Sequence, residues 1–332
     1  MKRGHSRMMK LGELQNLKIG VLGDAMLDRY LVGKVSRVSP EAPIPVVNYQ
    51  HEKNVLGGAT NVTRNVCDFG AQAHTIAVVG SPSEETSVLN NLLTNLRGST
   101  SHLVSDPLRP TTTKMRVLGN GQQIVRIDRE ETFMLAPEVE EQVLKNLDRL
   151  ATECDAVIVA DYAKGVITPR IVERLKQLAA DGFLVTVDPH PKNLQDWSGV
   201  QVLKPNLSEL IQMTGQNVSL KVGEDPRENE QFRTAVEELS QRYSIPHLLL
   251  TLSEHGMVYV RANQDWHWEP SLVREVFDVS GAGDTVISYF TLALAAGWSG
   301  EDATKLANQA ASLVVQKLGT ASLSFEELKK NI

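Results

Sequence analysis

Residues 155–187, DAVIVADYAKGVITPRIVERLKQLAADGFLVTV, contain two continuous apolar runs with an amphipathic helix pattern between them. The runs Asp155–Ala160 and Phe183–Val187 lack the polar alternation of a strand that has one face in water. Thr168 precedes a proline and predicts the start of a helix over Pro169–Asp181. A strand, a helix and a second strand in this order predict a βαβ unit with parallel strands that are buried on both faces.

The same alternation of buried strands and helices extends in both directions along the chain. Two segments, 31–50 and 111–129, depart from it because polar and apolar residues alternate there, which predicts antiparallel strands with one solvated face. We therefore expect an α/β fold: a three-layer α/β/α sandwich around a mostly parallel central sheet, with a small inserted β lid made from these two segments. Further strands are predicted at Lys18–Gly23, Gln72–Val79, Gln201–Leu203 and His247–Leu252, and further helices at Gly58–Phe69, Glu84–Leu96, from Asn206, at Gly281–Ala295 and at Glu301–Leu318.

The composition indicates a globular protein. The 332 residues include 34 Lys+Arg against 40 Asp+Glu, and the net charge of -6 argues against a surface built for nucleic acid. Apolar runs are far shorter than the roughly 20 residues of a membrane-spanning helix. Cys67 and Cys154 are far apart and fit a reducing compartment, so we expect a cytoplasmic protein without nucleic-acid or membrane partners. Residues 1–16 are basic and are predicted to form a flexible tail.

Residues 278–284, DVSGAGD, precede an apolar helix and are the sharpest candidate for a functional site. The two glycines let the backbone approach a ligand closely, and unpaired amides at a helix start attract an anion. Asp284, in the first turn, could take a proton from a hydroxyl that attacks a phosphoryl group bound there. The alternative is a glycine-rich turn in which Asp284 only interacts with the helix dipole.

Two turns near the N-terminus carry further candidates. Residues 57–61, GGATN, open a helix, and the Asn61 amide could bind sugar hydroxyls or simply lie on the helix surface. Asp28 closely follows the first predicted strand, at the edge of an α/β sheet where ligands bind.

Two later turns are also candidates. Lys164 follows the strand Asp155–Ala160 and could meet a phosphate as a point charge or lie in solvent. Asn206 and Glu209 have the spacing of a capping box, and Glu209 could in addition orient water bound to magnesium.

DVSGAGD together with the upstream GGATN resembles the two signatures of the PfkB/ribokinase family of carbohydrate kinases. The stretches GDAMLDRY, SRVSPEAPIPVV, DYAKG, KPNLSEL, TLSEHGM and KLGTAS resemble the heptose 7-phosphate kinase branch of this family. The resemblance implies a ribokinase-like fold over residues 17–332 as a single kinase domain, with lid segments at about 31–50 and 111–129. It also implies that ATP and Mg²⁺ are bound.

The resemblance further implies roles for individual residues. Asp284 would be the general base, and the amides of Gly281, Ala282 and Gly283 would stabilise the transferring phosphoryl group. The sugar would be bound by Asp28, Gly57, Gly58 and Asn61. A sugar that already carries a phosphate needs cations at its far end, and the candidates, in the DYAKG turn and the inserted strands, are Lys164, Arg116, Arg126 and Lys114. The nucleotide would be bound by Asp188, Asn206, Glu209, Thr251, Ser253, Gly256 and Asn308, with Glu209 holding magnesium through water. Residues 188–191, DPHP, depart from the Asp-Pro-Lys-Gly of similar kinases.

The implied reaction moves the γ-phosphoryl group of ATP to O1 of D-glycero-β-D-manno-heptose 7-phosphate and gives the 1,7-bisphosphate for lipopolysaccharide core synthesis. The alternatives are a kinase for another sugar, such as fructose 1-phosphate, or for a nucleoside, and a non-catalytic sugar- or nucleotide-binding regulator on the same fold. No HxGH-type nucleotidyltransferase motif occurs, so we expect a stand-alone kinase or the kinase half of a longer protein. Strand edges in the lid favour pairing between subunits, which predicts a homodimer.

Overall fold

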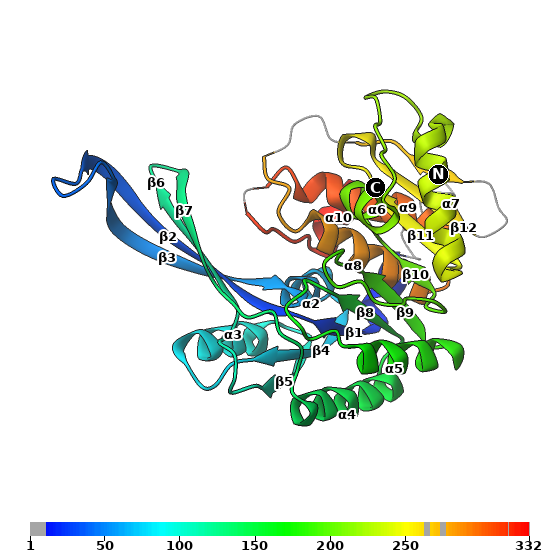
Figure 1. The fold of residues 1–332 in the computed structure, drawn as a ribbon, viewed down its shortest axis with the longest axis horizontal. Coiled ribbons are helices and arrows are strands. Elements are labelled where there is room, and N and C mark those ends of the chain that lie inside the picture. Colours follow the sequence, from blue (N-terminus) through cyan, green and yellow to red (C-terminus); the bar gives the residue numbers. More distant parts are fainter. Residues whose placement is uncertain (1–10, 262–265, 273–276, 318, 332) are drawn as a thin grey trace.

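The computed structural model describes residues 11–261, 266–272, 277–317 and 319–331 (Figure 1). A central sheet lies between two layers of helices, as predicted. Within the described residues, β12 is antiparallel to both of its neighbours and every other neighbouring pair of strands in this sheet is parallel. The strand order is β13 (His267–Glu269), β12 (Met257–Arg261), β11 (His247–Thr251), β10 (Val202–Leu203), β9 (Leu184–Asp188), β8 (Ala156–Ala160), β1 (Lys18–Gly23), β4 (Gln72–Val79), β5 (Ser99–Ser105).

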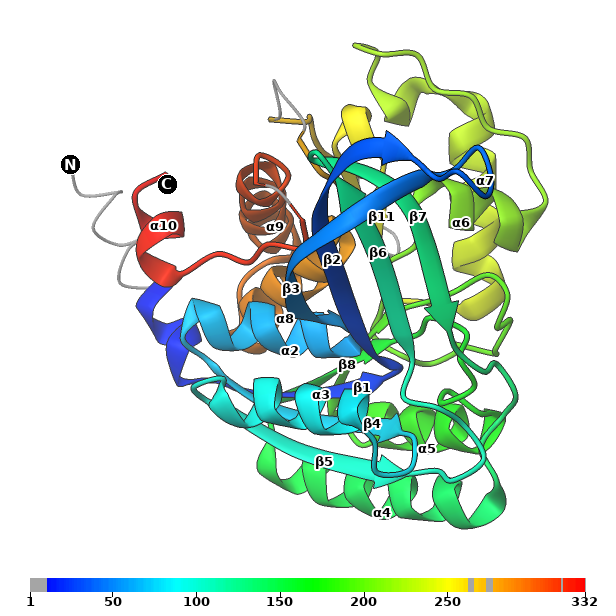
Figure 2. The same ribbon diagram turned by 90° about the vertical axis from the view of Figure 1, so that its left-hand side faces the viewer.

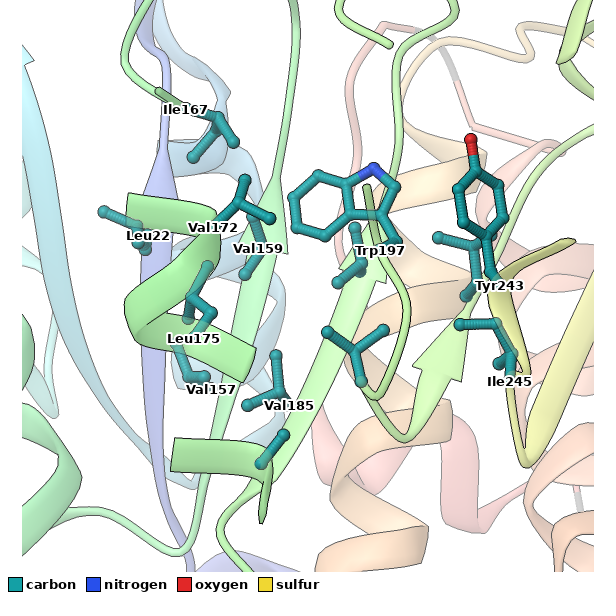
Figure 3. Packing of buried hydrophobic residues seen from close by; sticks show 14 of the residues in the cluster. Leu22, Val157, Val159, Ile167, Val172, Leu175, Val185, Trp197, Tyr243 and Ile245 are labelled. Atoms are coloured by element: carbon teal, nitrogen blue, oxygen red, sulfur yellow. The ribbon is translucent and has the colours of Figure 1, made fainter. Parts of the chain in front are cut away.

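Helices cover both faces of this sheet, which explains the continuous apolar strands because successive residues of a strand point to opposite faces. Leu22 of β1 belongs to one buried cluster, together with Val172 and Trp197 (Figure 3), whereas the adjacent Val21 packs in a second cluster with Phe69. The first cluster includes residues of α4 (Pro137–Glu153), α5 (Pro169–Ala180), α6 (Leu207–Thr214) and α7 (Glu230–Tyr243). The second includes residues of α2 (Ala59–Phe69), α8 (Ala282–Ala295), α9 (Gly300–Val314) and α10 (Phe325–Lys329). The remaining helices in the described part of the chain are α3 (Glu84–Asn95) and the short 3₁₀ helices η1 (Leu14–Asn16), η2 (Pro226–Glu228) and η3 (Ser253–His255).

Four strands outside the sandwich form the lid, which confirms the predicted β insertion. Their order is β3 (Pro45–Gly58), β2 (Ala25–Val38), β6 (Thr113–Gly119) and β7 (Gln122–Arg129). The pairs β2–β3 and β6–β7 are antiparallel, and β2 and β6 join them as a parallel pair. Figure 2 shows the four strands rising side by side from the body of the molecule. The first two strands are longer than the predicted segment 31–50, so Asp28 and Gly57 lie on strands of the lid.

The last long helix ends earlier than predicted. We expected a helix over residues 301–318, but α9 ends at Val314, and residue 318 lies outside the described part of the chain. The carbonyl oxygen of Val315 accepts hydrogen bonds from the N–H groups of Phe277 (2.9 Å) and Asp278 (3.2 Å). These bonds attach the loop that precedes α8 to the end of α9 and take the place of further helical bonds at this carbonyl.

The N-terminal segment is ordered further upstream than predicted. Leu11 is 2% exposed and Leu14 is 0% exposed, and both pack in the cluster that contains Phe69. The prediction of a flexible tail over residues 1–16 is therefore wrong from Leu11 onward, and residues 1–10 lie outside the described residues. None of the helices in the described ranges combines the length and the apolar character needed to cross a membrane.

Candidate active site

The carboxyl ends of the central strands bring candidate residues to one edge of the sheet. The residues at the ends of β1, β8, β9 and β10, or within two positions after them, include Asp24, Tyr162, Asp188 and Lys204. The N-terminus of α8 reaches the same edge, because a Cβ atom on Gly283 would lie 3.5 Å from Nζ of Lys204 and 3.9 Å from Oδ2 of Asp188. Ligands of open α/β sheets bind at this edge, so the arrangement defines a candidate active site.

Asp284 lies in the first turn of α8 and is only 6% exposed. Its Oδ2 atom accepts a hydrogen bond from Nδ2 of Asn61 (2.6 Å), and its Oδ1 atom accepts one from the hydroxyl of Tyr162. Burial raises the pKa of Asp284 to about 6 and the charge of Asp188 adds to this effect, although the two donors and Lys204 oppose it. A carboxylate with this pKa is mostly ionised at neutral pH and can accept a proton from a hydroxyl.

Asn61 has a free acceptor beside this carboxylate. A carboxylate only accepts hydrogen bonds, so Asn61 must turn its Nδ2 toward Asp284. Its Oδ1 atom is then buried without a hydrogen-bond partner in the part of the chain that the structure describes. Asn65, one turn further along α2, donates to the carbonyl oxygen of Asn61 (2.9 Å) and accepts from the hydroxyl of Thr285 (2.9 Å), which fixes α2 against α8. Asn61 is thus placed to accept a hydrogen bond from a ligand hydroxyl.

The turn before α8 retains free amides, as an anion site requires. Gly281 has a φ of +82°, a left-handed conformation that glycine adopts without strain. The N–H of Ala282 donates to the carbonyl of Val279 (3.2 Å), whereas no partner for the N–H groups of Gly281 and Gly283 occurs among the described residues. The predicted anion site therefore has two free amides at the positive end of the helix dipole.

Lys204 adds a cation to this anion site. Its side chain is 3% exposed, and its Nζ lies 2.8 Å from Oδ1 of Asp188. Burial lowers the pKa of Lys204, but Asp188, Glu209 and Asp284 raise it by more, so the ammonium group stays charged. This lysine was not among the residues predicted from the sequence, although a lysine directly after a buried strand in the KPNLSEL stretch is a usable signal.

Asn206 and Glu209 form the predicted capping box at the start of α6. The Glu209 N–H donates to Oδ1 of Asn206 (2.9 Å), and Oε2 of Glu209 accepts from the Asn206 N–H (2.8 Å). Burial, followed by the charge of Asp188, raises the pKa of Glu209 to about 7. No group of three or more His, Cys, Asp or Glu residues that could hold a metal occurs in the described ranges. The carboxylates of Glu209 and Asp188 fit Mg²⁺, because this ion typically binds through one or two carboxylates and completes its shell with water and substrate phosphates.

The predicted nucleotide residues at and after the end of β11 start beside this capping box. Thr251 pairs with Asn206 through an isolated β-bridge, and Ser253 lies in the short helix that follows. Gly256 has a φ of +84°, and a Cβ atom there would lie 2.0 Å from a carbonyl oxygen of β13, so only glycine fits. Asn308 of α9 donates to the backbone carbonyl that directly follows β13 (2.9 Å), so it supports this segment, and its role in nucleotide binding stays a prediction.

The predicted sugar-binding residues meet where the lid joins the body. Asp28 is buried and accepts a hydrogen bond from Nη1 of Arg116. A Cβ atom on Gly57 would lie 2.5 Å from Oδ2 of Asp28, so this carboxylate would have to move, whereas Gly58 has a φ of +55° at the start of α2 and requires glycine. The charge of Asp28 also acts on the hydroxyl of Tyr162, which places this carboxylate near the one of Asp284.

The register of the lid places three cations in one row. Lys53 of β3, Tyr30 of β2, Arg116 of β6 and Arg126 of β7 are successive partners across the four strands. Directly paired residues point to the same face of a sheet. This face is turned toward the body, because Tyr30, Lys53 and Arg116 line a cavity of about 510 Å³ whose other wall comes from the loop before α8 and the residues after α9. Sequence analysis named Arg116 and Arg126 but missed Lys53, which has no ion-pair partner among the residues described.

Lys164 and Lys114, the other predicted cations, contact the acids Glu130 and Asp128, and Asp128 also contacts Arg126 of the row. Nζ of Lys164 lies 2.7 Å from Glu130, and Nζ of Lys114 lies 3.2 Å from Glu130 and 3.3 Å from Asp128. Arg126 contacts Asp128 through both Nε (2.8 Å) and Nη2 (2.9 Å). The acids partly neutralise these cations, and the structure does not bring Lys164 into the row that contains Arg116.

The fold and this site define the class of the protein. The sequence profile of the family described as pfkB family carbohydrate kinase matches residues 16–327, and the chain belongs to this family. Its activity is accordingly that of an ATP-dependent carbohydrate kinase, which favours the predicted enzyme over a non-catalytic regulator.

Curated relatives are similar over nearly the whole chain. Bifunctional protein HldE of Photobacterium profundum is 40% identical over 325 residues, which are 98% of this chain and 65% of that protein. Bifunctional protein HldE of Paramagnetospirillum magneticum is 37% identical over 324 residues, or 96% of this chain and 64% of that protein. The chain thus spans slightly less than two thirds of the length of these relatives.

Solved structures confirm the ribokinase-like fold. Phosphofructokinase-2 from Escherichia coli in complex with substrates and products superposes with a TM-score of 0.74 at 17% identity, covering 95% of this chain and 98% of that chain. Arabidopsis thaliana ribokinase complexed with ribose and ATP superposes with a TM-score of 0.69 at 18% identity, with the same two coverages.

Proposed function

We propose that this kinase phosphorylates O1 of D-glycero-β-D-manno-heptose 7-phosphate with ATP and Mg²⁺ in the cytoplasm. The product, the 1,7-bisphosphate, would enter lipopolysaccharide core synthesis. The observation that carries the proposal is the row of Lys53, Arg116 and Arg126 on the body-facing surface of the lid. A free sugar has no need of such cations, whereas a sugar with a phosphate at its far end does. The stretches that resemble heptose 7-phosphate kinases support the choice of sugar.

The chemistry follows from the residues around the N-terminus of α8. Asp284 removes the proton from the attacking hydroxyl, which Asn61 helps to orient through its unpaired Oδ1. The free amides of Gly281 and Gly283, together with Lys204, stabilise the charge that develops on the transferring phosphoryl group. Glu209 and Asp188 would hold Mg²⁺ together with water and substrate phosphates, and the bound ion would neutralise negative charge on the phosphates.

A substrate panel tests the proposal. ADP release in a coupled assay is measured with heptose 7-phosphate, other phosphorylated sugars, the matching free sugars and nucleosides, with Asp284→Asn as the blank. We expect heptose 7-phosphate to give the highest kcat/KM. A higher value for fructose 1-phosphate or for a nucleoside would contradict the substrate assignment while leaving the kinase class intact.

Two variants distinguish the possible phosphate sites. Lys53→Ala removes the cation of the lid row that has no acidic partner among the described residues, and Lys164→Ala removes a cation that is paired with Glu130. If the row binds the phosphate, Lys53→Ala reduces the preference for phosphorylated over free sugar by about tenfold or more, and Lys164→Ala changes it less. A larger loss of this preference in Lys164→Ala than in Lys53→Ala would assign the phosphate to Lys164 and its neighbours.

The outward face of the lid supports a homodimer. Val125 and Ile127 alternate with Arg126 on β7, so they lie on the face turned away from the body, next to their partners Val117 and Met115 on β6. Every residue of β7 is exposed, so the predicted burial of one face is not found on this edge strand. A second copy of the chain could cover this apolar edge. Sedimentation equilibrium should show a dimer that Ile127→Lys weakens; a monomeric wild-type protein at micromolar concentration would contradict the proposal.

A further inference from the structure

Tyr162 makes a contact with the general base that none of the roles above uses. Its hydroxyl donates to Oδ1 of Asp284, while Asn61 donates to Oδ2 from the other side at 2.6 Å. A carboxylate can accept about four hydrogen bonds, two at each oxygen. The two donors therefore fix the plane of the carboxylate and still leave acceptor positions for a substrate hydroxyl.

The turn that carries Tyr162 is fixed from several directions. The buried carboxylate of Asp24 accepts hydrogen bonds from the N–H groups of Tyr162 (2.8 Å), Lys164 (3.2 Å) and Val166 (3.3 Å). Nη1 of Arg109 donates to the carbonyl oxygen of Lys164 (2.7 Å) and holds the outer side of the turn. With its backbone fixed in this way, the phenol has little freedom to leave Asp284.

The phenol is also a permanent donor. Burial, followed by the charge of Asp284, raises the pKa of Tyr162 well above its ordinary value, so the hydroxyl keeps its proton throughout the working pH range. The other charged groups that act on Asp284 are Asp188 from β9, Lys204 after β10 and Arg64 from α2. Among the side chains that contact Asp284, Tyr162 is thus a neutral donor whose loss leaves the charges around the base unchanged.

We propose that Tyr162 is a positioning residue that holds the carboxylate of Asp284 ionised and aligned for proton removal from the sugar hydroxyl. The inference depends on the proposed function only in taking Asp284 as the base. It does not depend on which sugar is the substrate.

The change Tyr162→Phe removes the donor and keeps the ring. The base then loses a hydrogen bond that favours its charged form, so its pKa rises by about one unit. We expect the acidic limb of the kcat/KM profile to move up by about one pH unit, and kcat to fall about tenfold with little change in the KM for ATP. A residue that only stabilised the fold would not shift this limb.

The matched control is Tyr289→Phe. Tyr289 is a buried tyrosine on the same helix as Asp284, and its hydroxyl donates to the carbonyl oxygen of Leu323 (3.0 Å), away from the active site. This variant should keep the wild-type pH profile. Tyr162→Met also lacks the hydroxyl and should shift the limb as Tyr162→Phe does, so the result does not depend on the folding of a single variant.

A second measurement needs no substrate. The carboxyl ¹³C signal of Asp284, assigned by its loss in Asp284→Asn, is titrated in the wild type and in the variants. A higher midpoint in both Tyr162 variants and an unchanged one in Tyr289→Phe supports the inference, even if the wild type does not accept heptose 7-phosphate. Unchanged midpoints and pH profiles in the Tyr162 variants would overturn it, even if heptose 7-phosphate proves to be the substrate.

Discussion

Replacing Lys204 by methionine should lower the free energy of unfolding by about 3–5 kcal/mol at pH 7. The lysine side chain is 3% exposed, and its Nζ lies 2.8 Å from Oδ1 of Asp188. Methionine retains most of the aliphatic stem, so the loss comes mainly from the charge that stays behind on Asp188 beside Glu209. Breaking a buried pair on one side leaves an uncompensated charge, which is why the cost is much larger than that of a surface ion pair.

The free energy of unfolding lost in Lys204→Met should be smaller at acidic pH than at neutral pH. Without Lys204, the buried Asp188 has a pKa in the folded protein well above its value in the unfolded chain. Below the pKa that Asp188 has in the unfolded chain, its carboxyl group is protonated and the variant loses no stability from this charge. The loss grows as the pH rises and becomes constant above the pKa that Asp188 has in the folded variant. Urea unfolding should therefore show a smaller difference between variant and wild type at about pH 5 than at pH 7.

The double change of Lys204→Met with Asp188→Asn separates stability from catalysis. It leaves no charge at this pair, so most of the lost stability should return. The cation next to Gly283 is still missing and Asp188 no longer offers a carboxylate to Mg²⁺, so turnover should stay at least about 10²–10³-fold below wild type. Stability is measured by urea unfolding and turnover by coupled ADP release. A double variant that is less stable than either single variant, or a Lys204→Met enzyme with normal turnover, would refute this reasoning.

Three further predictions concern the base and the sugar site. Asp284→Asn should lower kcat by at least ~10²-fold with a modest loss of sugar binding; near-normal turnover in the ADP-release assay would remove Asp284 as the base. Because the pKa of Asp284 is about 6 and the base works ionised, wild-type kcat/KM should rise with pH through this value, and a flat profile from about pH 5 to 7 would contradict the assignment. Gly57→Ala places a Cβ atom 2.5 Å from Oδ2 of Asp28, so it should raise the KM for sugar but not for ATP. Equal changes in both KM values would contradict a role for Gly57 on the sugar side.

Local patterns in the sequence determined the elements and their order. The sequence predicted β1 and β4 at the bounds that the structure shows, and the continuous apolar run of β1 is typical of a strand covered on both faces. Helix starts were equally predictable, because a cap involves residues that are close in sequence. Thr168 accepts from the N–H of Ile171 (3.3 Å), and Asn206 and Glu209 cap α6. The two glycine-rich motifs also indicated Asn61 and Asp284, which the structure joins by a hydrogen bond.

Only the tertiary structure decided what surrounds these motifs. The end of α9 depends on bonds from Phe277 and Asp278 to Val315, which no pattern within the helix encodes. The row of Lys53, Arg116 and Arg126 depends on the register of four strands in two hairpins, β2–β3 and β6–β7, which lie far apart in the sequence. A shift of one residue would turn these side chains to the other face.

The properties of the catalytic carboxylate likewise depend on the tertiary structure. The sequence supplied an aspartate at a helix start, but burial and the charge of Asp188 raise its pKa to about 6, against the opposing effect of Tyr162, Asn61 and Lys204. Tyr162 and Lys204 reach Asp284 and its helix only because the carboxyl ends of parallel strands meet at one edge of the sheet. The residue types are local information, whereas the distances and the burial that make them reactive arise when the chain folds.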